Sequence, residues 1–315
     1  MAGTGGAPLT FKGLPIEQYL KGLDASLMNE TDNVQTFTSD LYKVSNINQY
    51  RITKQSFSGL PQAGAWQADG DAPNLQAMAF RFDITATMAY VGNGTAYTKK
   101  LFDHQRYDLI ERGPTLLNHS MQHAEAIQAA SLYQNGFDTY WNTGAAEYWF
   151  TASHALDPRA YNNVGGTYSN LVTGKLNVSN LQTARRLLEN TPDDMGRPGF
   201  YKATNLFIPT ALEDVAIESV ARKMQYRPDS ANYTPNALAE TNPGLKIVVV
   251  PWFDLYSATA WYLADSGKRA AIWNWDVPLE KWTADDPHSK THYQYASYAW
   301  MNWLDDWRGV VASQG

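Results

Sequence analysis

Two histidines have the spacing of a metal site. His119 and His123 are four residues apart, so a helix would place both side chains on one face, as paired metal ligands require. A stable site needs further ligands, and Glu125 is the only acidic residue close to them in the sequence. We therefore interpret the two histidines as part of a polar helix face and predict no metal ligands.

Two other motifs point to catalysis or cofactor binding. Ser153, His154 and Asp157 have the residue types of a hydrolase triad, but adjacent Ser and His side chains rarely meet correctly, and the sequence has no Gly-x-Ser-x-Gly motif. Residues 92–94 (Gly-Asn-Gly) begin like a dinucleotide-binding loop, but Tyr97 stands where the third glycine belongs and no βαβ pattern follows. We interpret residues 92–94 as a turn.

Three pairs of neighbouring aspartates could supply a general acid and a general base. They are residues 193–194, 285–286 and 305–306, and each is more simply explained as a loop or helix end, where Asp is favoured. With these alternatives weighed, the sequence predicts no catalytic residues, no cofactor-binding residues and no metal ligands. We therefore expect a structural protein rather than an enzyme.

The composition excludes several classes of protein. The 315 residues include no cysteine, which rules out disulfides, thiolate zinc sites, iron–sulfur clusters and cysteine nucleophiles. Charged residues are 18%, the net charge is −6, and no basic stripe is present, so tight binding to nucleic acid is not expected. The 11 Trp and 19 Tyr suit either a glycan-binding groove or a core with large protein interfaces.

Neither a leader peptide nor a membrane segment is expected. Residues 1–13 are rich in glycine and lack the charged and apolar regions of a secretory signal. The longest apolar run, residues 247–253, contains Pro251 and is far shorter than the ~20 residues that cross a bilayer. These features predict a protein made in a cytosol, with no membrane contact.

A long hairpin is predicted near the N-terminus. Tyr50, Ile52 and Phe57 indicate an outgoing strand, and residues 79–88 alternate between apolar and polar side chains as a returning strand would. The connection between them, residues 59–74, is too long and too polar to form a core of its own. We therefore expect the hairpin to contact another subunit.

Residues 113–136 have the pattern of the longest helix. Gly113 and Pro114 would begin it, and Asn135 with Gly136 would end it in a left-handed cap. The apolar face is expected to consist of Leu117, Met121, Ala124 and Ile127. At 1.5 Å per residue such a helix is about 31 Å long, which suits a central support, and we call it the spine helix.

The remaining elements indicate an α+β fold. We expect helices over residues 15–27, 179–188 (with Ser179 as N-cap) and 211–224, and strands at 206–209, 247–250, 260–264 and within 293–311. Helices and strands are segregated along the chain, and no internal repeat is visible.

The order of these elements resembles the major capsid proteins of tailed bacteriophages, which have the Hong Kong 97-type fold, and several motifs resemble those of Mu-like head subunits. The motifs lie at residues 132–137, 151–156 (Thr-Ala-Ser-His-Ala-Leu), 166–171 (Gly-Thr-Tyr-Ser-Asn-Leu), 206–213, 227–236, 248–254, 260–265 and 307–310. Together they cover roughly residues 45–315 in the order of the family.

The resemblance implies a division of the chain into four parts. These are an N-terminal arm (1–48), an extended loop (49–96), a peripheral domain (97–177 and 276–315, with the spine helix 113–136), and an axial domain (178–275). The arm and the extended loop would contact neighbouring subunits. Some relatives join subunits through a lysine in the extended loop, but this chain has no lysine between Lys54 and Lys99, which favours non-covalent contacts.

The resemblance also implies a function. The chain would be a major capsid protein that assembles into pentamers and hexamers, forming an icosahedral shell around the double-stranded DNA genome of a tailed phage. Its partners would be itself, a separate scaffolding protein, a portal and a decoration protein, with packaged DNA contacted only weakly. Assembly would occur in the host cytoplasm, and the final location would be the virion. Two alternatives stay open: an encapsulin-like nanocompartment shell, and an aromatic-rich protein that binds or cleaves glycans.

Overall fold

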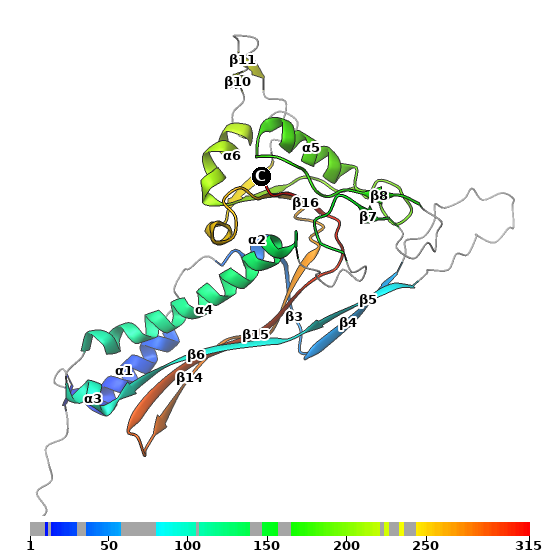
Figure 1. Cartoon of the computed structure of the whole chain (residues 1–315). Helices are drawn as coiled ribbons and strands as arrows, with labels where there is room; N and C mark the ends of the chain where they lie inside the picture. The colour runs from blue at the N-terminus through cyan, green and yellow to red at the C-terminus, as the bar shows by residue number, and fades with distance from the viewer. Residues whose placement is uncertain are drawn as a thin grey trace, which may run out of the picture.

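The computed structural model describes residues 10–11, 14–29, 36–57, 80–104, 107–138, 147–156, 165–220, 224–226, 233–235 and 244–315. Two four-stranded sheets dominate this part of the chain, one long and one compact (Figure 1). The long sheet extends along the molecule beside a long helix, and the compact sheet lies above it with two helices of its own. The mixture of helices and strands agrees with the expected α+β class.

The long sheet has the strand order β3-β14-β15-β6. Its strands are β3 (Lys43–Asn46), β14 (Ala271–Asp286), β15 (Thr291–Leu304) and β6 (Ala89–Thr98). β14 and β15 form an antiparallel hairpin with two register shifts in β14, near Val277 and Pro278. The sequence did not predict β14, because a proline and an irregular apolar pattern interrupt it and only pairing with β15 makes it a strand.

β6 corrects the interpretation of residues 92–94 as a turn. Gly92 and Gly94 lie within the strand, opposite Ser297 and Tyr295 of β15. A Cβ atom at Gly94 would come 2.7 Å from the Tyr295 ring, so glycine here permits the close approach of an aromatic side chain. The glycines reflect cross-strand packing rather than chain reversal.

The spine helix is α4 (Tyr107–Asn135), and it begins six residues earlier than predicted. Gly113 and Pro114 lie inside it instead of at its start. A side chain at Gly113 would clash with the hydroxyl of Tyr97 of β6, so glycine here makes room for that ring. Proline removes one helical hydrogen bond, a cost that packing against β6 and β15 offsets.

The buried face of α4 also differs from the prediction in part. Leu117 and Met121 are buried as expected, but Ile127 is 39% exposed. The helix ends at Asn135 as predicted, yet Gly136 is not among the described glycines with positive φ, so the left-handed cap is wrong. Gly136 is needed because a Cβ atom there would lie 2.8 Å from the Phe150 ring. The buried side of α4 is formed by Ile110, Leu117, Met121, Ala126, Ala129, Ala130, Leu132 and Tyr133.

Three helices and one strand pair accompany the long sheet. They are α1 (Ile16–Asn29), α2 (Thr38–Leu41), α3 (Lys99–Asp103), and β1 (Thr10–Phe11) paired with β2 (Leu14–Pro15). The predicted N-terminal helix is confirmed as α1, which buries Leu23 and Leu27 and packs against α4. An amphipathic segment of this length gains its stability from that packing.

The compact sheet has the order β12-β9-β13-β16. Its strands are β9 (Asn205–Ile208), β12 (Lys246–Val249), β13 (Trp261–Ala264) and β16 (Val310–Ser313), and the helical segments around it are α5 (Val178–Glu189), α6 (Glu213–Val220) and the short 3-10 helices η1 (Thr210–Leu212) and η2 (Pro251–Leu255). The N-cap of α5 is Asn177, whose side chain accepts a hydrogen bond from the Asn180 N–H at 2.8 Å, rather than the predicted Ser179.

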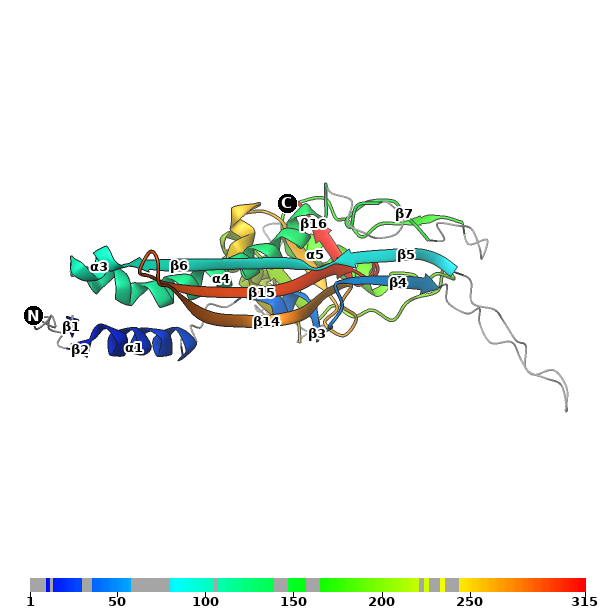
Figure 2. The ribbon, with the colours of Figure 1, turned by 90° about the horizontal axis from the view of Figure 1, so that it is seen from below.

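The predicted hairpin is confirmed as β4 (Arg51–Phe57) and β5 (Phe80–Thr87), which pair antiparallel. The connecting residues 59–74 lie outside the described part of the chain. Figure 2 shows the hairpin extending from the N-terminal end of β6, on the side opposite α3. Two further pairs are β7 (His154–Ala155) with β8 (Thr167–Tyr168), and β10 (Met224–Tyr226) with β11 (Tyr233–Pro235).

Aromatic side chains join the two sheets. Trp273 of β14 lies 5.3 Å from Tyr42 and 5.2 Å from Trp300, measured between ring centroids. Tyr133 of α4 is 5.3 Å from Tyr262 of the compact sheet. These contacts form one continuous core, so many of the aromatic residues counted in the sequence have a structural role.

Candidate functional site

The two histidines with metal-ligand spacing pack against neighbouring rings. His119 and His123 both lie on α4, with ring centroids 6.4 Å apart, and His123 packs edge-on against Trp252 at 5.0 Å. In the part of the chain that the structure describes, no group of three or more His, Cys, Asp or Glu residues could hold a metal ion.

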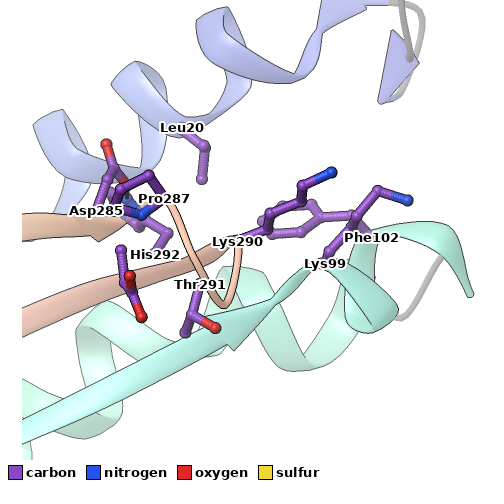
Figure 3. Close-up of a pocket in the computed structure, with 9 residues that line it drawn as sticks. Leu20, Lys99, Phe102, Asp285, Pro287, Lys290, Thr291 and His292 are labelled. Atoms are coloured by element: carbon purple, nitrogen blue, oxygen red, sulfur yellow. Dashed lines mark hydrogen bonds and ion pairs between the residues drawn. The ribbon is translucent and has the colours of Figure 1, made fainter.

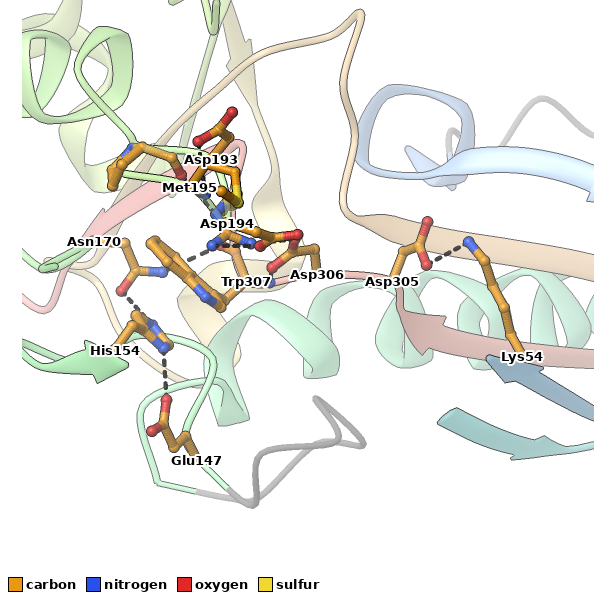
Figure 4. Close-up of polar contacts among 12 residues, drawn as sticks. Lys54, Glu147, His154, Asn170, Asp193, Asp194, Met195, Asp305, Asp306 and Trp307 are labelled. Atoms are coloured by element: carbon orange, nitrogen blue, oxygen red, sulfur yellow. Dashed lines mark hydrogen bonds and ion pairs between the residues drawn. The ribbon is translucent and has the colours of Figure 1, made fainter. Parts of the chain in front are cut away.

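His154 is a buried packing residue. Its ring stacks on Trp307 at 4.2 Å with an angle of 4° (Figure 4). Nε2 lies 3.1 Å from both the Trp149 carbonyl and Asn170 Oδ1, and Nδ1 lies 3.0 Å from Glu147 Oε2. Burial lowers the pKa of His154, and the hydrogen bond with Glu147 opposes that shift.

The other members of the triad motif do not join His154. Ser153 is exposed, and Asp157 lies outside the described residues. The ring nitrogens of His154 face the oxygens of Glu147, Trp149 and Asn170, not a serine. The described geometry therefore supports a structural link between β7 and Trp307, instead of proton transfer to a nucleophile.

The aspartate pairs participate in ion pairs and turns. Arg308 is buried and contacts Asp194 at 3.0 Å and Asp306 at 2.7 Å, and its Nε donates to the Pro192 carbonyl at 2.7 Å. Asp193 accepts hydrogen bonds from Arg197. These contacts attach the loop after α5 to the segment before β16, which is a structural task.

The remaining aspartates hold the edges of the long sheet. Asp305 pairs with Lys54 of the β4–β5 hairpin at 2.5 Å. Asp286 accepts from the His288 N–H at 2.9 Å and so stabilises the turn between β14 and β15. Asp285 lies 2.6 Å from Nδ1 of His292.

A cavity of about 330 Å³ lies at the outer end of the long sheet. Figure 3 shows α1 on one side of it and α3 with the β14–β15 turn on the other. Leu20, Phe102 and Pro287 supply apolar lining. His292 lies beside the cavity with Nε2 2.9 Å from Asp24 of α1, so this contact ties the N-terminal helix to the sheet. No pattern in the sequence indicates this contact, because Asp24 and His292 are separated by 268 residues.

The β4–β5 hairpin carries exposed polar side chains. The side chains of Arg51, Thr53 and Lys54 are exposed on β4. Its base packs on β15 through Ile84 and Met88, on the side opposite α4. Among the described residues, its contacts with the rest of the subunit include this packing on β15 and the ion pair of Lys54 with Asp305.

Comparison with known proteins identifies the family. A model of the family described as phage capsid protein matches residues 81–313. The chain belongs to this phage capsid protein family. No curated protein sequence matches the chain.

Solved structures agree with the fold of this capsid protein. The cyanophage Pam1 capsid aligns with a TM-score of 0.56 and 12% identity, over 90% of this chain and 93% of that chain. A structure from Microbacterium phage Oxtober96 gives 0.54 and 8%, over 90% and 92%, and the capsid of cyanophage P-SCSP1u gives 0.54 and 9%, over 87% and 86%. At these identities the similarity establishes the shared fold alone.

Membership of this family distinguishes a structural protein from an enzyme. Phage capsid proteins are structural components of the virion rather than enzymes, so the expectation of a non-catalytic protein is confirmed. The encapsulin-like alternative is not better supported than a phage capsid protein. In the described residues, no helix combines the length and hydropathy needed to cross a membrane.

Proposed function

We propose that this capsid protein is the major head subunit of a tailed phage, assembling into pentamers and hexamers of an icosahedral shell around double-stranded DNA. The family match supports a shell subunit. The main support for this mode of assembly is the β4–β5 hairpin. It extends from the N-terminal end of β6, on the side opposite α3, and side chains of β4 are exposed to solvent. A ribbon of this kind gains contacts when it lies over a neighbouring subunit.

The proposal assigns a role to each of four parts of the chain. Residues 1–48 form the arm and 49–96 the extended loop, and both contact neighbours. Residues 97–177 and 276–315 form the peripheral domain, with β16 completing the sheet of the other domain. Residues 178–275 form the axial domain, which surrounds the five-fold and six-fold axes.

Further partners belong to the same proposal. A separate scaffolding protein, a portal and a decoration protein would act with the subunit during assembly in the host cytoplasm. The net charge of −6 supports weak, non-specific contact with packaged DNA, because strong phosphate binding needs clustered basic residues.

Deletion of residues 60–74 tests this function. The expected product is a soluble subunit that forms no durable shells in sedimentation and electron microscopy, because the extended loop can no longer reach its neighbour. A variant with these residues replaced by a glycine–serine linker of equal length separates the loss of side chains from the loss of length. Normal particles from both variants would contradict the proposal.

The purified wild-type protein separates the alternatives. Megadalton shells that contain DNA when isolated from infected cells support the capsid role. Shells that enclose protein cargo and no DNA would support a nanocompartment. A 35.2 kDa monomer whose tryptophan fluorescence responds to sugars would support the glycan-binding alternative and overturn the proposal.

A further inference from the structure

The two ends of the compact sheet differ in their surface chemistry. β9 and β12 are parallel, and their carboxyl ends lead into η1 with α6 and into η2. The loop of residues 190–204 precedes β9 and lies against the turn after β13, so it occupies the opposite end of the sheet. With four-residue strands of about 3.3 Å per residue, only about 13 Å of sheet separates the two ends.

Phe200 projects from the loop end. It is 87% exposed, and its φ of 57° lies in the left-handed region, which is costly for a bulky residue. The backbone on both sides is held in place: the Gly199 N–H donates to the Thr191 carbonyl at 2.9 Å, and the Lys202 N–H donates to Asp265 Oδ2 at 2.9 Å. The fold therefore maintains a strained conformation that keeps an aromatic ring in solvent.

Two exposed lysines lie beside Phe200, while the aspartates of the same loop, Asp193 and Asp194, are paired with Arg197 and Arg308. Lys202 is exposed two residues further along the chain. Lys268 is also exposed, and its Nζ donates to the Gly199 carbonyl at 2.6 Å. An exposed aromatic residue with two adjacent lysines suits a partner that is apolar in its centre and acidic at its edge.

The other end of the same sheet has those properties. The first turn of α6 carries Glu213 and Asp214, both exposed. Beside them, Val215 is 38% and Leu255 of η2 is 62% exposed, and Tyr256 follows at 45%. We call this surface, formed by Glu213, Asp214, Val215, Leu255 and Tyr256, the α6–η2 face.

We propose that Phe200 of one subunit packs against the α6–η2 face of the next subunit in the ring. This inference rests on the proposed function and specifies its ring contact. A surface at one end of a sheet that complements the opposite end of an identical sheet produces a head-to-tail contact, and such contacts form a ring when the rotation between neighbouring subunits closes. The occupant is a second copy of this chain because both complementary surfaces belong to the chain itself. A rigid, exposed aromatic residue is the kind of side chain that dominates interface energies.

Cross-linking tests the contact directly, because the chain has no cysteine and every thiol is an introduced one. Two double variants are made, one with Lys202→Cys and Asp214→Cys and the other with Lys202→Cys and Leu255→Cys. Shells assembled from each variant are treated with an oxidant or a short bismaleimide. The expected result is a ladder of linked chains up to pentamers and hexamers. The control pairs Lys202→Cys with Leu116→Cys on α4, which should give no ladder.

The outcomes distinguish the two proposals. Shells without a ladder from either cysteine pair would overturn the Phe200 contact and leave the capsid function intact. A wild-type protein that forms no shells under any condition would overturn the capsid function itself. A ladder from the Leu116 control as well would show random collisions and would also overturn the contact.

Substitution of Phe200 gives an independent readout. Phe200→Ala should raise the concentration needed for assembly at least about tenfold, as expected when a central interface residue is lost. Phe200→Gly should assemble equally poorly but unfold about 1–2 °C above Phe200→Ala, because glycine adopts positive φ without strain. Normal assembly of either variant would contradict the proposal, as would equal stability of the two.

Discussion

The two sheets of the capsid protein are covered in different ways. Every residue of β9, β13 and β16 is buried, with Leu206 and Ile208 facing α5 and α6 while Phe207 faces the aromatic core. The long sheet is covered mainly on the side of α4 and α1. On the other side, the outer part of β14 and β15 leaves Trp282 44% exposed, stacked on Tyr295 at 5.5 Å.

This difference shows which sheet has both of its faces covered within one subunit. A sheet that is covered on both faces buries the apolar side chains of those faces within one chain. A sheet that keeps exposed aromatic residues along half its length has not, and an assembled shell provides neighbours for such a surface. The two sheets also differ in how they are attached to their neighbours. Edge-to-face aromatic contacts of Tyr42 with Trp273 and Tyr133 hold the long sheet to α4. A polar network around Asn170 and Arg308 connects the compact sheet to β7 and β8.

Trp273→Ala should have the largest effect. The side chain is fully buried between Tyr42 and Trp300, so its loss leaves a large cavity and costs about 3–5 kcal/mol in free energy of unfolding. Trp282→Ala on the same strand is the control and should cost less than about 1 kcal/mol. Urea denaturation of the unassembled subunit measures both. Equal costs would show that the covered and uncovered regions of the long sheet do not differ.

Asn170→Ala tests the polar connection of the compact sheet. Asn170 accepts from the Thr151 N–H at 3.0 Å and donates to the Trp149 carbonyl at 2.7 Å, so its loss leaves buried backbone groups unpaired. We expect a loss of about 2–4 kcal/mol, measured by urea denaturation. Asn180→Ala, which removes an exposed hydrogen bond to the Lys175 carbonyl, should cost under about 1 kcal/mol. A loss as small as that of the control would mean that the network contributes little.

Glu125→Gln should have the smallest effect and the opposite sign. Burial raises the pKa of Glu125 on α4, although Thr38, which donates to Oε1 at 2.6 Å, opposes the shift. When the pKa of a carboxyl is higher in the folded state than in the unfolded state, the stability of the folded protein falls as the pH rises through the folded-state pKa. The variant should therefore be more stable than the wild type at pH 8, by up to about 1 kcal/mol, and equal to it near pH 4.

Thermal unfolding at the two pH values measures this difference. Glu280→Gln replaces an exposed carboxylate of β14 and serves as the control, with no change expected between the two pH values. A Glu125→Gln variant that is less stable at pH 8 would show that the charge of Glu125 stabilises the contact between α2 and α4.

Local patterns predicted most elements with strong periodicity. Alternation at residues 79–88 indicated β5, and helical spacing indicated α1 and much of α4. The failures have a common cause. β14, the glycines of β6 and Gly113 are explained by contacts with residues far away in the sequence, such as Tyr295 and Tyr97. Periodicity reports only neighbours along the chain.

The candidate site residues show the same limit. The sequence singled out His154 and the aspartate pairs by residue type, and the structure assigns the described ones to packing, ion pairs and turns. Phe200 carries no sequence signal, since its importance depends on its φ and its exposure. The contact of Asp24 with His292 needs α1 to fold back on the long sheet.

The sequence alone determined the absence of thiol chemistry, the acidic balance, the α+β class and the long hairpin, because these follow from composition and from spacing between near neighbours. The tertiary structure decided which aromatic side chains are buried and which remain exposed at the ends and outer face of the sheets. That division depends on packing between segments more than 200 residues apart, such as Ser45 with Asn274. No local pattern encodes such a contact, and the surfaces proposed for assembly are therefore visible only in the folded chain.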